Sequence, residues 1–233
     1  MATIVARPTT LTLPLSVSAP PVVVTVKFCP TVTVPMIKAL ESVIEHCVPI
    51  VPTFTFQANL ADYGAAVGAS DEIRTLFQKE IEESAVMLRR AYDAGVPLLC
   101  GTESGFSLTP YGDWHYRELE IFVRNLGFSP LEAITASTSA NAFAIGLEGE
   151  TGALEVGRLA DVIIVDGDVV KDVSLLGERD RIRHVILGGQ SCEVATAISR
   201  VDPPGWRATT YGSSRLTRAM IDGLGTHTAK PGK

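Results

Sequence analysis

The segment at residues 96–106, "VPLLCGTESGF", joins an apolar run to a turn of small residues that contains one carboxylate, Glu103. The run "VPLLC" has the length and composition of a buried strand, and the Gly and Ser residues after it are typical of a turn. A carboxylate placed where a buried strand ends is either a catalytic or ligand-binding group or a polar residue that closes the strand. The rest of the chain has to decide between the two.

The residues before this segment alternate between helical and strand patterns. Residues 36–47 carry apolar side chains at helical spacing, and residues 48–56, "VPIVPTFTF", predict a buried strand. Residues 70–95 predict the clearest helix of the chain, because Ser70 can cap its start and Gly95 can end it.

The residues after the segment continue the alternation. Residues 113–127 predict a helix that Gly127 ends. Residues 129–146 predict another helix, in which Ser129 and Glu132 stand in the positions of a capping box. Alternating helices and strands are typical of parallel α/β architecture. We therefore expect an α/β fold.

The pattern changes again further along the chain. Two short strands bounded by Gly, within residues 160–165 and 182–190, indicate a small β-structure outside the α/β unit. The chain is thus expected to divide into a Thr/Val/Pro-rich segment (1–35), an α/β unit (36–150), β-strands (151–192) and a loosely ordered tail (193–233). The first segment fits short strands and a mobile arm equally well.

Composition excludes several classes of function. The chain has 233 residues, 46% of them hydrophobic, and a net charge of −6, so it can bury a sizeable core. Without a basic patch, neither nucleic acid nor an anionic membrane is expected as the main partner. The four cysteines form no CxxC pair and no apolar run is long enough to span a membrane. The N-terminus lacks the apolar centre of a signal peptide, so we expect a cytoplasmic protein.

Three stretches in order resemble the amidohydrolase superfamily, and within it the imidazolonepropionase- and prolidase-like metal-dependent hydrolases. They are "AGVPLLCGTESGF", "YRELEIFVRNLGFSPLEAITASTSANAFAIGL" and "GALEVGRLADVIIVDGD" followed by "IRHVILGGQ". The resemblance covers roughly residues 48–190. It implies a partial TIM-type (β/α) barrel, comprising the last βα units, followed by strands of a small β-sandwich.

The resemblance also implies chemistry. Members of this superfamily hydrolyse amide, ester or related bonds with a water activated by a divalent metal, most often zinc. Glu103 matches the position of the family's carboxylate on the last barrel strand, which touches metal and water and serves as general base and then acid. Glu103 is thus predicted as the catalytic residue and, together with His115, as a metal ligand.

The sequence departs from the family pattern in its histidines. It contains four, His46, His115, His184 and His227, and none of them forms the His-x-His pair that the family's metal centre needs. A full barrel also takes roughly 250 residues. The strands expected before residue 48 are absent, so the chain resembles the C-terminal portion of an amidohydrolase.

Four residues after the 96–106 segment are predicted to bind the substrate. His115 lies just past the strand end, where the family forms substrate-contacting loops, although a partly exposed histidine at a helix start is an equally good reading. Tyr111 and Trp114 could recognise an acyl or aromatic group, and Arg117 could bind a carboxylate bidentately.

The remaining candidates have structural interpretations. His46 is expected at a helix C-terminus, where a cation is favourable, and His184 is expected inside a strand. Asp161 is expected to make turn hydrogen bonds. Cys100 is expected to be buried without a nearby base, and His227 is assigned no role.

Two hypotheses from different classes follow. The first is a metal-dependent hydrolase acting on a small-molecule amide or ester. The second is a catalytically incomplete homologue that acts through self-association or a partner chain, because an unfinished barrel leaves strand edges and apolar surface uncovered. The sequence therefore also predicts a homo-oligomer.

Overall fold

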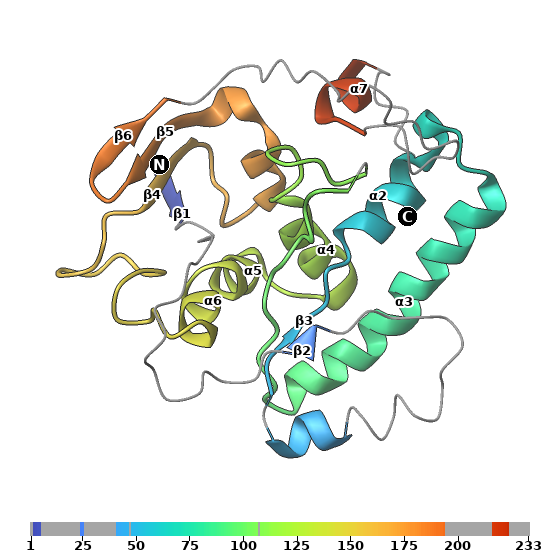
Figure 1. Cartoon of the computed structure of the whole chain (residues 1–233), viewed down its shortest axis with the longest axis horizontal. Helices are drawn as coiled ribbons and strands as arrows, with labels where there is room; N and C mark the ends of the chain where they lie inside the picture. Colours follow the sequence, from blue (N-terminus) through green and yellow to red (C-terminus); the bar gives the residue numbers. More distant parts are fainter. Residues whose placement is uncertain are drawn as a thin grey trace.

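The computed structural model describes residues 2–5, 24–25, 41–46, 48–106, 108–193 and 216–223. Figure 1 shows a body of helices with a small sheet at one end, where β1 and β4–β6 lie. The body contains β2 (Val24–Thr25), β3 (Ile50–Val51), α2 (Thr55–Tyr63), η1 (Gly64–Val67), α3 (Asp71–Asp93), α4 (Arg117–Leu126), α5 (Pro130–Ser137) and α6 (Ser139–Ala144).

The second part of the structure is built from both ends of the chain. Its elements are β1 (Ala2–Val5), β4 (Val162–Asp166), η2 (Val173–Gly177), η3 (Arg179–Arg181), β5 (Ile182–Leu187) and β6 (Gln190–Cys192), while α7 (Arg218–Gly223) lies apart from the sheet (Figure 1). The strands form one antiparallel sheet in the order β1-β4-β5-β6. The expected strands are present, but a second sheet facing this one is not found among the described residues.

Local sequence signals explain where the long helices begin and end. The Ser70 hydroxyl accepts a hydrogen bond from the Ile73 amide at the start of α3. Ser129 and Glu132 form the predicted capping box of α5. Gly127 ends α4 with φ of 68°, a left-handed conformation that suits a residue without Cβ.

Two predicted elements are shorter than expected. The helix expected over 129–146 is divided into α5 and α6 at Thr138, whose backbone leaves the helical region. The strand expected over 48–56 is reduced to β3, because α2 already begins at Thr55.

The parallel strand pairing expected of an α/β fold is present over short segments. β2 pairs parallel with β3, and Ile50 forms a parallel bridge with Leu98. The Leu99 amide donates to the Ile50 carbonyl at 2.9 Å, and the Ile50 amide donates to the Pro97 carbonyl at 3.0 Å. The backbone after β3 and the backbone after Leu98 therefore emerge at the same edge. Closure of a barrel is not seen in the described residues.

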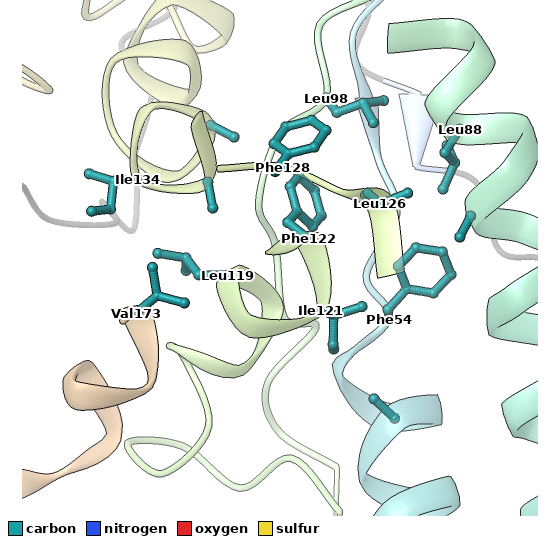
Figure 2. Packing of buried hydrophobic residues seen from close by; sticks show 14 of the residues in the cluster. Phe54, Leu88, Leu98, Leu119, Ile121, Phe122, Leu126, Phe128, Ile134 and Val173 are labelled. Carbon is teal, nitrogen blue, oxygen red and sulfur yellow. The ribbon is translucent and has the colours of Figure 1, made fainter. Parts of the chain in front are cut away.

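One apolar core joins most of these elements. Figure 2 shows Phe122 and Phe128 next to each other, with Leu98 and Leu126 on one side of them and Leu119 and Ile134 on the other. The Phe122 and Phe128 rings meet edge to face, with centroids 5.1 Å apart. Burial of these side chains holds the helices against the short strands.

Part of the predicted tail is packed. Leu216 is fully buried against the cluster that contains Trp114 and Leu60, and α7 follows it directly. Residue 216, in the segment expected to be loosely ordered, is therefore part of the packed core. In the described part of the chain, no helix has the length and apolar composition needed to cross a membrane.

Candidate functional site

The two parallel segments end in unusual backbone geometry. Thr53, after β3, and Glu103, after the Leu98 segment, have φ of 56° and 47°, and they are the non-glycine residues with positive φ in the described chain. A Cβ atom at Gly101 would lie 2.5 Å from Cγ1 of Val51, so the two backbones pass in close contact. Left-handed geometry costs such residues on the order of 1–3 kcal/mol, and strain of this kind is concentrated at functional sites.

A cavity of about 320 Å³ opens beside these strand ends. Its apolar lining comes from Cys100 and Leu119 in the body and from Ile163, Leu176 and Ile182 in the sheet region. The polar and charged lining consists of Thr102, Asp113, His115, Tyr116, Ser137, Asn141, Arg179 and Arg218. The cavity therefore lies where the body, the sheet region and α7 meet.

The hydrogen bonds of His115 indicate which ring nitrogen carries the hydrogen. The Gly112 amide donates to Nε2 at 3.2 Å, so this nitrogen is the acceptor. Nδ1 then carries the hydrogen of the neutral ring, and it lies 3.5 Å from the hydroxyls of Thr102 and Ser104. Burial lowers the pKa of His115, more than Asp113 raises it, which favours the neutral ring. His115 thus offers an N–H donor at the cavity wall.

Two arginines on the sheet-region side contact the 112–116 loop. Arg179 Nη2 donates to the Gly112 carbonyl at 2.8 Å and to Asp113 Oδ1 at 3.0 Å. Arg218 donates to the Tyr116 hydroxyl and to Asp222. Burial raises the pKa of Tyr116 to about 12, so its phenol stays protonated.

Glu118 is a buried carboxylate that the sequence did not reveal. Its side chain accepts from the Phe54 amide at 2.9 Å and from the Thr55 hydroxyl at 2.6 Å, at the turn where the chain enters α2. Burial raises its pKa to about 7, although these hydrogen bonds and Arg117 oppose the rise. Burial also raises the pKa of the neighbouring Cys100, as expected for a thiol that is not a nucleophile.

The structure separates the predicted site residues. His115 lines the cavity, whereas Glu103 and Tyr111 are exposed outside the cavity lining. Trp114 is fully buried, and its indole N–H donates to the Leu216 carbonyl at 2.8 Å. Arg117 is also buried, where it pairs with Asp62 and Glu120. Trp114 and Arg117 are therefore outside the cavity lining, and their assignment to substrate binding stays a prediction.

The described residues do not fit the predicted metal centre. They contain no group of three His, Cys, Asp or Glu side chains that could hold a metal ion. Both ring nitrogens of His115 also have hydrogen-bond partners, the Gly112 amide at Nε2 and the Thr102 and Ser104 hydroxyls at Nδ1. The structure therefore does not support a metal site formed by Glu103 and His115.

The other interpretations of single residues can also be checked. His46 is exposed at the end of its helical turn and bonds the Ser42 carbonyl, and His184 lies in β5. Asp161 accepts from the Gly188 amide and the Thr151 hydroxyl, which confirms the expected turn hydrogen bonds. His227 lies outside the described residues.

Residues 23–192 match the Amidohydrolase family, and the chain belongs to this family. It is 56% identical over 41 residues to an imidazolonepropionase of Symbiobacterium thermophilum, covering 18% of this chain and 10% of that protein. It is 34% identical over 101 residues to an ochratoxinase of Aspergillus niger, covering 43% of this chain and 20% of the relative.

A solved structure agrees with these relationships. A Xaa-Pro dipeptidase with bound methionine in its active site superposes with a TM-score of 0.53 at 25% identity, covering 67% of this chain and 37% of that one. The chain therefore spans well under half of the length of the relatives it matches. Arg218 lies beyond the residues that match the family.

Proposed function

We propose that the chain takes part in hydrolysing an amide or ester bond of a small molecule held in the cavity beside His115. The observation that carries this proposal is the position of the cavity, next to the carboxyl ends of adjacent parallel segments. Enzymes built on TIM-type barrels have their active sites at this edge. Membership of the Amidohydrolase family supports the same class of reaction.

His115 has a defined part in this proposal. A neutral imidazole that presents Nδ1–H can donate to the carbonyl oxygen of the scissile bond and stabilise the negative charge that develops there. The Thr102 hydroxyl lines the same part of the cavity and can orient the carbonyl. No metal-dependent step is included, because the described residues do not form a metal site.

The test is hydrolysis by the full chain of p-nitrophenyl acetate and of Xaa-Pro dipeptides. The dipeptides are chosen because the structural relative is a Xaa-Pro dipeptidase. His115→Gln is expected to lower turnover by roughly a hundredfold, as removal of one donor to a developing oxyanion does. His184→Gln is the matched control, since His184 is an exposed side chain of β5. Equal activity of the two variants, or no turnover by the native chain, would contradict the proposal.

The second candidate is a homologue that binds without turnover and assembles with another copy. The observation that favours it is the lack of a metal-ligand group in the described residues. β6 is an edge strand of the sheet, and exposed apolar side chains at Leu154, Val156 and Leu159 lie in the loop before β4. Light scattering checks this candidate, which expects a dimer or larger; a compact monomer counts against it.

A further inference from the structure

The charged side chains of the cavity are mostly donors. Arg179 and Arg218 bring two positive charges, Asp113 brings one negative charge, and Asp113 is already paired with Arg179 at 3.0 Å. His115 presents Nδ1–H, and the protonated Tyr116 presents an O–H. A cavity rich in donors and cations favours an anionic ligand.

Arg218 is the member of this set that is best placed to meet a ligand. Its side chain is 31% exposed, close to the 36% of Arg179, but Arg179 is already paired with Asp113, the acidic residue of the cavity lining. Its guanidinium carries five N–H donors in a planar fork, and its described partners are Asp222 and the Tyr116 hydroxyl. Asp222 is 59% exposed, and an ion pair this close to water competes weakly with a ligand carboxylate.

Contacts behind the cavity hold Arg218 in position. The Trp114 indole donates to the Leu216 carbonyl, two residues before Arg218, and Leu216 is fully buried. The Arg218 guanidinium also lies over the Tyr116 ring, with Cζ 5.6 Å from the centroid. The α7 segment is therefore fixed to the same loop that carries His115.

We infer that Arg218 and Tyr116 form a carboxylate-binding subsite in the cavity, and that the ligand is a small carboxylic acid with an apolar body. The apolar body packs against the side of the cavity formed by Leu119, Ile163 and Leu176. A volume of about 320 Å³ restricts the ligand to a small molecule. Arg218 would then determine ligand specificity, although it lies outside the residues that match the family. This inference rests on the proposed function for the choice of cavity.

The test is calorimetric titration of the full chain with hexanoate and with its neutral counterpart hexanamide. The native chain is expected to prefer hexanoate by roughly tenfold to a hundredfold, the ratio expected for hydrogen bonds to a charged group. Arg218→Gln should abolish the preference, and Arg218→Lys should retain part of it because the charge remains without the fork. Arg183→Gln is the matched control, since Arg183 pairs with Asp166 on the exposed side of the sheet.

The outcomes separate this inference from the proposed function. Equal binding of hexanoate and hexanamide by the native chain, or an unchanged preference in a folded Arg218→Gln protein, overturns the subsite. Thermal melting shows whether that variant is folded. Tyr116→Phe keeps Arg218 and removes one donor, so it tests the hexanoate preference in a second variant. If the chain prefers hexanoate in a way that depends on Arg218 but shows no turnover, the subsite is supported and the proposed hydrolase function is contradicted.

Discussion

The helical body and the wall of the cavity are stabilised in different ways. The body is held by apolar burial, with Phe122, Leu126 and Phe128 packed against Leu98. The wall is held by hydrogen bonds and ion pairs between segments distant in sequence, such as Arg179 with Asp113 and Trp114 with Leu216. Apolar burial supplies most of the stability of a domain, whereas directional polar contacts position groups with small net energy. The body should therefore control folding, and the wall should control binding.

The largest expected effect is in the body. Phe122→Ala removes a fully buried ring at the centre of the core and should lower the free energy of unfolding by about 3–5 kcal/mol. Urea unfolding followed by circular dichroism measures the change. A loss below about 1 kcal/mol would show that the body does not depend on this packing.

The next effect comes from Glu118, a fully buried carboxylate that accepts hydrogen bonds from the Phe54 amide and the Thr55 hydroxyl. The pKa of Glu118 is raised from 4.5 to about 7, so the folded state binds more protons than the unfolded state between these values. The contribution is present below the unfolded pKa and is lost as the pH rises through about 7, and its size is on the order of 3 kcal/mol. Glu118→Gln mimics the protonated form, so its stability relative to the native chain should increase from about pH 5 to pH 8.

The control for this pH dependence is Glu155→Gln, an exposed carboxylate paired with Arg158. Other titrating groups are the same in both proteins, so they cancel in the difference between variant and native chain. A constant difference between Glu118→Gln and the native chain across the pH range would mean that Glu118 is not protonated by burial.

A smaller effect is expected in the wall. Trp114→Phe keeps the apolar ring and removes the indole N–H that bonds the buried Leu216 carbonyl, which should cost about 1–3 kcal/mol. Because this bond anchors the segment that carries Arg218, hexanoate affinity should fall while the helical circular dichroism signal stays. If stability fell and hexanoate affinity did not change, the hydrogen bond would contribute to folding and not to ligand binding, contrary to the role assigned to the wall.

The smallest effect is expected on the outer face of α3. Lys79→Gln removes an ion pair with Glu83 in which both side chains are mostly exposed. The free energy of unfolding should change by no more than about 0.5 kcal/mol, and ligand binding should not change. A larger loss in thermal or urea unfolding would show that surface charge contributes more than this account allows.

Sequence reasoning found the features that depend on neighbouring residues. The caps at Ser70 and Ser129 were predicted correctly, because capping involves residues three positions apart. The division of the last long helix at Thr138 was not predicted, since no Gly or Pro marks it. The site was predicted less well. His115 lines the cavity, but Glu118 was not singled out from the sequence.

The missed residues depend on contacts that no local pattern contains. Glu118 is satisfied by the Phe54 amide, 64 positions earlier in the chain. The Trp114 indole donates to the carbonyl of a residue 102 positions later. Arg218 lies in a tail whose composition suggested a loosely ordered segment, and the described contact with Tyr116 becomes visible only in the folded chain.

The proposed function makes His115 a hydrogen-bond donor in the cavity and includes no metal at this residue. The most direct measurement is a long-range ¹H–¹⁵N NMR spectrum of the histidine rings of the full chain at neutral pH, before and after zinc is added, with His115→Gln for assignment. The neutral Nδ1–H form is expected for His115, and zinc should leave it unchanged. A ring protonated at Nε2, or a zinc-induced shift of either His115 nitrogen, would contradict this expectation.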